Sequence, residues 1–153
     1  MTTSITIISG VVIFVLGQII LKSIIEPSLD LKKSISSLSG LILLNHSKIT
    51  NASIDNQLAY DLKIKTTDII AKTSNILFFT LTSKIFQLPS KNNIILSAKK
   101  INSICYSLKK ETRDSIQAES INGKKTNFPF NNSISLDEIS KLLKIKTSFE
   151  LWY

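Results

Sequence analysis

The chain begins with a run of hydrophobic positions that no charged residue interrupts. Residues Ile5 to Leu21 contain no Asp, Glu, Lys or Arg, and the apolar stretch continues to Ile25 across the single Lys22. At about 1.5 Å per residue, a helix over this stretch is roughly 32 Å long, enough to cross a hydrocarbon core of about 30 Å. The pattern predicts an N-terminal transmembrane anchor over residues 1–26.

The placement of the lysines predicts how this anchor is oriented. Lys22, Lys32 and Lys33 follow the apolar run, whereas no Lys or Arg precedes it. Cytoplasmic flanks carry an excess of basic residues. We therefore expect a single-pass protein of the inner (cytoplasmic) membrane, with its N-terminus outside and its C-terminal domain in the cytoplasm. A cleaved signal peptide is disfavoured, because the chain has neither a basic segment before the apolar run nor a small-x-small site after it.

Beyond the anchor, apolar residues recur at steps of three and four, which is the helical period. The predicted fold is all-α: one transmembrane helix, then a small antiparallel bundle of three longer helices and a short C-terminal helix. We expect the bundle over 27–110, a polar loop over 111–134, and a short helix with an aromatic tail over 135–153. The expected helices cover 28–46, 54–87, 90–110 and 135–143, the third capped by Ser90 and the last opened by a capping box from Ser135 to Glu138.

Two residues mark the exit from the membrane. Pro27 lacks an N–H and clashes with the preceding turn, so we expect a kink or break there, with Pro27 opening a new helix. Glu26 and Asp30 would then lie at the positive end of that helix. Lys22 is placed to extend its ammonium group to the headgroups while its stem stays in lipid.

One face of the anchor combines small, aromatic and amide side chains. Gly10, Phe14, Gly17, Gln18 and Leu21 share this face at helical spacing. Small residues allow close approach of two backbones, and an amide in lipid seeks a partner across a helix pair. The face is therefore a candidate for self-association into a homo-oligomer. The alternative is that Gln18 lies near enough to the interface to stay hydrated.

The segment from Ile76 to Leu88 is unusually apolar for an exposed helix. It is too short to span a bilayer. The pattern leaves two interpretations: the segment forms the middle of the bundle, or Phe78, Phe79 and Phe86 face lipid headgroups. The role of the aromatic tail Phe149–Tyr153 is similarly open between a groove, an interface and disorder.

Composition narrows the function classes. The net charge of +8 is the difference between 19 basic and 11 acidic residues, and Arg113 is the only arginine. The lysines are scattered, without the arginine, glycine and aromatic residues that accompany nucleic-acid binding. Attraction to an anionic membrane leaflet explains the charge better, so nucleic acid is disfavoured as a partner.

The sequence presents no catalytic constellation, and we expect neither an enzyme nor a cofactor or metal site. His46 is the only histidine and Cys105 the only cysteine, which excludes multi-His metal sites and His-dependent triads. We expect His46 near the C-terminal end of the first cytoplasmic helix and Cys105 in the core. Asp61 and Asp68 lie on either side of Lys65, which predicts ion pairs on one helix face.

The motif GQIILKSIIEP, from Gly17 to Pro27, resembles a family of small bacterial single-pass membrane proteins of uncharacterised function. Similarity extends through LILLNHSKITN, ILFFTLTSKIFQLPSKNN and ISLDEISKLLKI, over roughly residues 10–145. The residues after Lys146 stand as an addition. The resemblance implies an anchored helical domain and supplies no catalytic or cofactor residues.

These observations together predict a membrane-anchored, non-catalytic interaction or accessory protein on the cytoplasmic face. Its expected partners are the lipid bilayer, an unidentified protein and a second copy of the chain. Two alternatives stay open: a basic helical module that binds anionic lipid or nucleic acid, and a small membrane-disrupting protein of the holin or toxin kind.

Overall fold

The computed structural model describes residues 2–111 and 127–149, and every regular element within these ranges is a helix. The all-α fold class predicted from the pattern is therefore confirmed. In chain order the elements are α1 (Thr2–Ile20), η1 (Leu21–Ile25, a π-helical turn), α2 (Glu26–Leu44), α3 (His46–Thr50), α4 (Asn56–Ser74), α5 (Phe79–Ile85), α6 (Lys91–Leu108) and α8 (Phe128–Leu143).

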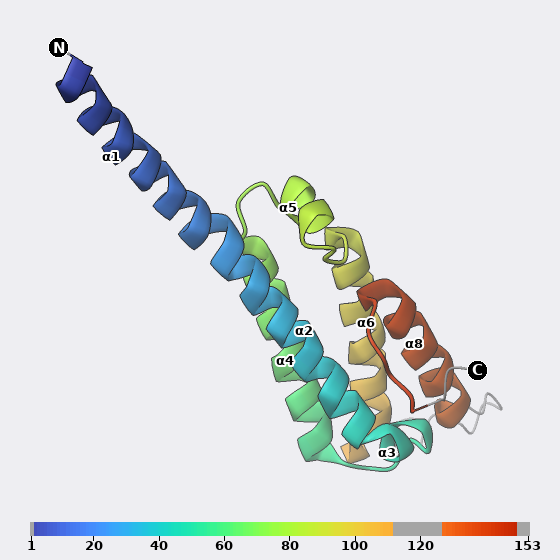
Figure 1. Cartoon of the computed structure of the whole chain (residues 1–153). Coiled ribbons are helices and arrows are strands. Elements are labelled where there is room, and N and C mark those ends of the chain that lie inside the picture. Colours follow the sequence, from blue (N-terminus) through green and yellow to red (C-terminus); the bar gives the residue numbers. More distant parts are fainter. Residues whose placement is uncertain (1, 112–126, 150–153) are drawn as a thin grey trace.

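Four helices build the bundle, while α1 projects from it (Figure 1). Helices α2, α4, α6 and α8 run alternately up and down, and each packs on the next in chain order. The short α3 closes the end away from α1 and contacts α8. The short α5 lies at the opposite end, where α1 leaves the bundle.

The core consists mainly of leucine and isoleucine side chains at the predicted helical spacing. On α2, the positions 31, 35, 38 and 42 are buried, which confirms the predicted apolar face of that helix. The neighbouring helices contribute the remaining large side chains of this cluster, including Leu62, Ile101, Ile104, Leu108 and Ile139. Lys100 of α6 and Glu138 of α8 form an ion pair at the edge of the core.

Pro27 lies in the first turn of α2, as expected, but no break separates this helix from the anchor. α1, η1 and α2 form one continuous helix (Figure 1), because the strain at Pro27 is absorbed in the π turn of η1. There the Glu26 N–H donates to the Leu21 carbonyl, five residues back rather than four. Glu26 and Asp30 consequently do not lie at a free helix N-terminus, and Asp30 pairs with Lys33 at 3.3 Å.

The single helix expected over 54–87 is also wrong. α4 ends at Ser74, and a turn leads to the separate α5. Phe78 at this turn has φ 51° and ψ 42°, a left-handed conformation that no right-handed helix can include. His46 lies two residues beyond the end of α2, near that helix end as expected, and begins the short α3.

The C-terminal helix begins earlier than the capping-box motif suggests. Asn127 caps α8, its side chain accepting the Phe130 N–H at 3.2 Å, and Pro129 lies in the first turn. Ser135 is buried inside the helix, so the predicted cap at Ser135 is wrong. The predicted loop accordingly loses 128–134 to α8, and its residues 112–126 lie outside the described ranges. In contrast, Ser90 caps α6 as predicted, accepting the Asn93 N–H at 3.2 Å.

Candidate membrane anchor and its junction with the bundle

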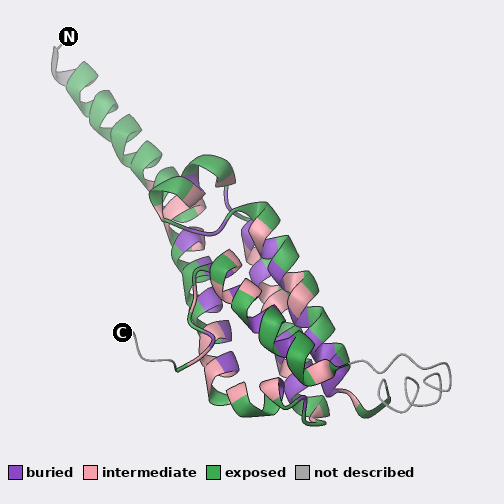
Figure 2. Ribbon diagram, turned by 90° about the vertical axis from the view of Figure 1, so that its right-hand side faces the viewer, coloured by how far each residue is buried: buried purple, intermediate pink, exposed green. Residues whose placement is uncertain are grey.

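The candidate anchor segment has apolar side chains on every side. Within the residues that the structure describes, one helix, from Ile5 to Leu44, is long and apolar enough to cross a membrane, and none of its most apolar window is buried by the rest of these residues. Ile13 is 70% exposed and Leu16 is 54% exposed. Figure 2 shows this segment exposed over most of its described length, in contrast to the buried faces within the bundle. A core helix of a soluble domain would instead show a buried stripe.

The candidate self-association face lies on this exposed segment. A Cβ built on Gly10 or on Gly17 meets no other part of the described chain within 4 Å, so another backbone has room to approach. Phe14 is exposed and Gln18 is half-buried on the same helix. The structure therefore leaves this face open, and its self-association stays a prediction.

The junction between anchor and bundle depends on Pro27. In an α-helix the Ser23 carbonyl would accept the N–H of residue 27, which proline lacks. The Leu77 N–H, from the turn before α5, donates to the Ser23 carbonyl at 3.4 Å. One turn further on, the buried Ser28 hydroxyl donates to the Ile24 carbonyl. The turn before α5 is thus hydrogen-bonded to the last turn of the anchor, beside Lys22.

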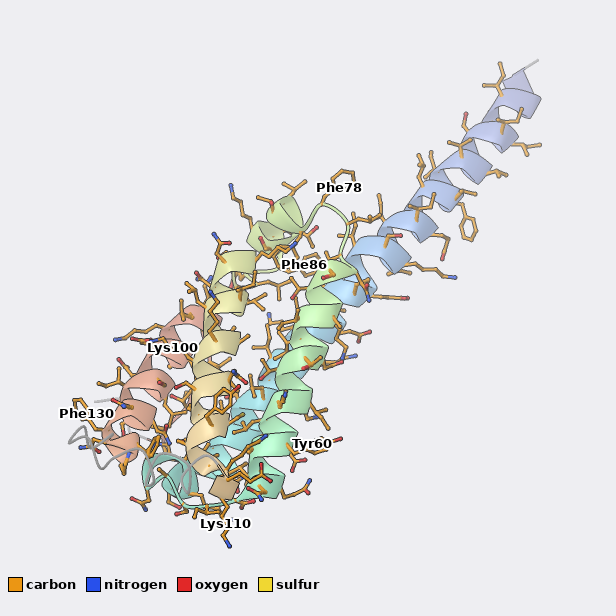
Figure 3. The ribbon with its side chains drawn as sticks, turned by 180° about the vertical axis from the view of Figure 1, so that it is seen from behind. Tyr60, Phe78, Phe86, Lys100, Lys110 and Phe130 are labelled. Atoms are coloured by element: carbon orange, nitrogen blue, oxygen red, sulfur yellow. The ribbon has the colours of Figure 1, made fainter. Side chains whose placement is uncertain are left out.

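The apolar segment from Ile76 to Leu88 serves both sides of this junction. Ile76, Thr82 and Leu88 are buried, and Phe79 and Phe86 pack against the core. The opposite side presents four large apolar residues to the outside, here called the α5 patch: Leu77, Phe78, Leu81 and Ile85. Figure 3 shows Phe78 at the outer edge of the turn beside the anchor, and Phe86 nearer the bundle. The segment therefore lies at one end of the bundle rather than in its middle (Figure 1), and of its three phenylalanines Phe79 and Phe86 contact the core while Phe78 is exposed.

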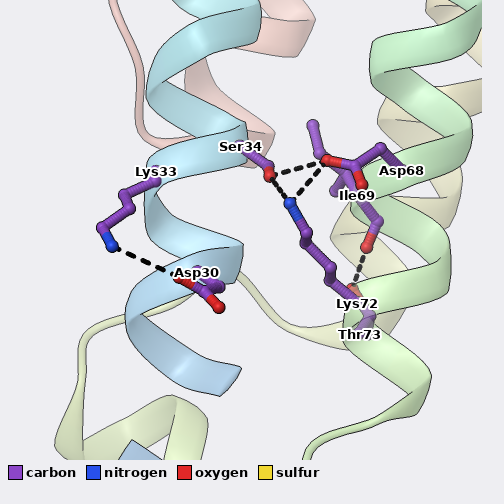
Figure 4. A network of polar contacts seen from close by, with 7 residues as sticks. All are labelled: Asp30, Lys33, Ser34, Asp68, Ile69, Lys72 and Thr73. Atoms are coloured by element: carbon purple, nitrogen blue, oxygen red, sulfur yellow. Dashed lines mark hydrogen bonds and ion pairs between the residues drawn. The ribbon is translucent and has the colours of Figure 1, made fainter. Parts of the chain in front are cut away.

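A polar network joins α2 to α4 below the junction (Figure 4). The Ser34 hydroxyl donates to Asp68 Oδ2 at 2.7 Å, and Lys72 Nζ donates to the same oxygen at 2.9 Å. Lys72 also donates to Ser34 Oγ at 2.6 Å. These bonds, chiefly that from Lys72, lower the pKa of the Asp68 carboxyl. The ion pair predicted between Lys65 and Asp68 is replaced by this network, because Lys72 and Ser34 supply the hydrogen bonds.

A buried amide joins three elements at the far end of the bundle. Asn132 of α8 is only 3% exposed. Its Nδ2 donates to the Ile49 carbonyl of α3 at 2.8 Å and lies 2.8 Å from Ser107 Oγ of α6. Sequence reasoning missed this residue because it fell within the stretch read as a loop. The only available signal was its position three residues before Ser135 and seven before Ile139, on the same helical face.

The chain's single cysteine is inert in its setting. Cys105 is buried, as predicted, and burial raises the pKa of its thiol to about 11. A thiol with such a pKa stays protonated at neutral pH and is a poor nucleophile. Within the described ranges, no three His, Cys, Asp or Glu side chains come together in a way that could hold a metal ion.

The surface of the bundle also carries a groove of about 590 Å³ along α4. Tyr60, Ile64 and Ala71 line it together with Lys63 and Glu111. Asp68 also borders the groove, but its carboxyl is engaged by Lys72 and Ser34. The groove therefore offers an apolar wall rather than paired reacting groups.

Comparison of the chain with protein-family models, curated proteins and solved structures gives no match in any of the three. The similarity of GQIILKSIIEP to bacterial single-pass membrane proteins accordingly stays a prediction.

Proposed function

We propose that this protein is a single-pass membrane-anchored helical protein that acts without catalysis, as an interaction or accessory subunit on the cytoplasmic face of the inner membrane. The observation that carries the proposal is the continuous helix from α1 to α2. Its N-terminal half exposes apolar side chains on all sides, and its C-terminal half packs into the bundle core. Such a helix needs lipid around one half and protein around the other.

The continuity of the helix has a mechanical consequence. A flexible linker between anchor and bundle would let the bundle reorient freely, whereas an unbroken helix fixes the orientation of the bundle relative to the anchor. The Leu77–Ser23 hydrogen bond adds a second point of attachment. A partner bound to the bundle would therefore be held at a defined distance from the membrane, which is a property expected of an accessory subunit.

The interior of the bundle supports a non-catalytic role. Within the described residues, every fully buried side-chain nitrogen or oxygen has a hydrogen-bond partner. The side chains of Asn132 and Ser34 form hydrogen bonds that join different helices. Catalytic sites more often hold titratable groups with strongly shifted pKa values that are free to react. Here Asn132 and Ser34 connect helices, while other buried hydroxyls, such as those of Thr73 and Ser97, bond within their own helix.

Membrane integration and orientation can be tested on the full chain. We expect the protein to resist extraction by alkaline carbonate. For orientation, Leu44→Cys and Thr3→Cys would be made separately with Cys105→Ala, because Leu44 is 84% exposed at the membrane-distal end of α2. An impermeant maleimide should label the Thr3 site in intact cells and the Leu44 site only after permeabilisation. Release by carbonate contradicts the anchor, and the reverse labelling contradicts the orientation.

The accessory role needs a partner that depends on the native bundle. Photo-crosslinking from Tyr60, which is 59% exposed on the groove of α4, should capture a reproducible protein in cells. The matched control is the same crosslinker at Ile134, which is 42% exposed on α8. Identical products from both sites, or none from either, would contradict a specific partner on α4. Loss of membrane potential on expression would instead favour the membrane-disrupting alternative.

A further inference from the structure

The α5 patch is an exposed apolar surface that the bundle does not explain. Leu77, Phe78, Leu81 and Ile85 are 52%, 76%, 62% and 66% exposed, respectively. They lie on a short helix and turn that already bury Ile76, Thr82 and Leu88 on their inner side. A contiguous exposed patch of large apolar residues marks an interaction surface.

The height of the patch relative to the anchor is set by a hydrogen bond. The Leu77 N–H donates to the Ser23 carbonyl at 3.4 Å, so the turn before α5 lies level with Ser23. Ser23 is 18 residues after Ile5. At about 1.5 Å per residue this separation is roughly 27 Å, close to the thickness of about 30 Å of a hydrocarbon core. The α5 patch therefore lies where the anchor leaves the hydrocarbon and meets the headgroups.

The backbone at Phe78 is consistent with a role for its side chain. Phe78 has φ 51°, a left-handed conformation that glycine adopts freely and that other residues adopt at a cost. The turn nevertheless holds an aromatic residue, and its ring lies on the outer edge of the turn beside the anchor (Figure 3). Aromatic side chains are enriched at this level of a membrane.

Two exposed lysines accompany the patch. Lys84 lies on α5 between Leu81 and Ile85 in the chain, and Lys22 precedes Ser23, whose carbonyl accepts the Leu77 N–H. Apolar residues flanked by lysine form the pattern of helices that lie in the plane of a membrane surface. The apolar surface of the patch also adjoins that of the anchor, which identifies the same bilayer as the occupant.

We propose that the α5 patch inserts into the headgroup region of the bilayer that α1 spans, so that the bundle is attached to the membrane at two points. This proposal rests on the membrane anchoring proposed above. Docking of α5 restrains tilting of the bundle, because a single spanning helix can tilt in the bilayer and the bundle tilts with it. The patch lies to one side of the α1 axis and adds a second contact.

Spin-label accessibility on the full chain tests the proposal. In a Cys105→Ala background, single labels would be placed by Leu81→Cys and by Ile85→Cys, and the proteins reconstituted into phosphatidylcholine–phosphatidylglycerol vesicles. Val12→Cys serves as the reference inside the span. Leu44→Cys serves as the matched exposed leucine at the distal end, 84% exposed. Circular dichroism verifies that each protein is folded.

At residues 81 and 85 we expect greater access to oxygen than to an aqueous nickel chelate, with the ratio between those of residues 12 and 44. Ratios at 81 and 85 equal to that at 44 would overturn the docking while leaving the anchor intact. Low access to both reagents at 81 and 85 would show burial in protein, such as a second copy, and would also overturn it. A water-like ratio at residue 12 would overturn the anchor itself, and the docking with it.

A second variant separates docking from folding. Phe78→Gly removes the ring while suiting the left-handed backbone, so the turn is expected to persist. Combined with Leu81→Ser, it should shift the ratio at residue 85 towards that at residue 44. The control is Ile95→Ser, which removes an apolar side chain that is 41% exposed on α6. An unchanged ratio at residue 85 in the double variant would overturn the proposal.

Discussion

The buried amide of Asn132 gives the sharpest test of how the bundle is held together. Its side chain bonds the Ile49 carbonyl of α3 and the Ser107 hydroxyl of α6, both at 2.8 Å. Asn132→Ala would remove both bonds, while the Ile49 carbonyl keeps the Ala52 N–H at 3.0 Å and the Ser107 hydroxyl keeps the Ile104 carbonyl at 2.7 Å. A hydrogen bond between neutral groups contributes about 0.5–1.5 kcal/mol net. With two such bonds lost, we expect the free energy of unfolding to fall by about 2 kcal/mol.

The neighbouring residue offers a matched control. Asn131 is exposed on the same helix, so Asn131→Ala makes the same change in helix propensity, worth up to about 0.7 kcal/mol, without touching the buried network. The difference between the two variants therefore isolates the buried hydrogen bonds. We expect it to appear as a melting temperature about 10 °C lower for Asn132→Ala than for Asn131→Ala.

Thermal unfolding of the full chain in detergent, followed by circular dichroism at 222 nm, measures this difference. The anchor is expected to remain helical in the micelle and to add a constant signal, so the transition reports the bundle. Equal midpoints for the two variants would refute the reasoning, because they would mean that the Asn132 amide contributes no net stabilisation. A lower midpoint for Asn131→Ala than for Asn132→Ala would mean that Asn131, and not Asn132, makes the stabilising contact.

Three further predictions concern other groups. Lys72 and Ser34 lower the pKa of Asp68 in the folded state, so the ionised carboxylate stabilises the fold above its unfolded pKa near 3.8, and this stabilisation is lost as the pH falls through the folded pKa. The free energy of unfolding should therefore decrease less between pH 5 and pH 2 for Asp68→Asn than for the natural chain. Cys105, with its thiol pKa raised to about 11 by burial, should resist iodoacetamide at pH 8 in the folded protein and react after denaturation, and labelling at equal rates in both states would contradict its burial. Gln18→Leu should weaken self-association in the membrane by about 0.6–1.7 kcal/mol, whereas Ile19→Leu on the other side of the helix should not, as measured by energy transfer between labelled copies.

The sequence by itself determined the features that depend on neighbours within about one helical turn. The exposed apolar helix, the buried positions of α2 and the Ser90 cap all follow from spacings of four residues or fewer. The burial of Cys105 follows from the same periodicity. The all-α class was predictable for this reason, because helical hydrogen bonds and apolar periodicity are local.

Local sequence patterns gave wrong helix boundaries at three places. Ser135 and Glu138 form a valid capping box by spacing, yet Asn127 and Pro129 begin the helix a full two turns earlier. The continuous apolar pattern over 54–87 concealed the left-handed residue Phe78. Pro27 predicted a kink or break, but the helix continues from α1 to α2 through a single π turn.

Only the tertiary structure decided which groups meet across the bundle. The Ile49 carbonyl finds its donor at Asn132, 83 residues away, and the Ser23 carbonyl finds Leu77. Such partners depend on which helix ends are brought together, and no periodicity in the chain encodes that choice. The same holds for the α5 patch, because the packing of α5 against the core divided one apolar segment into an inner and an outer side.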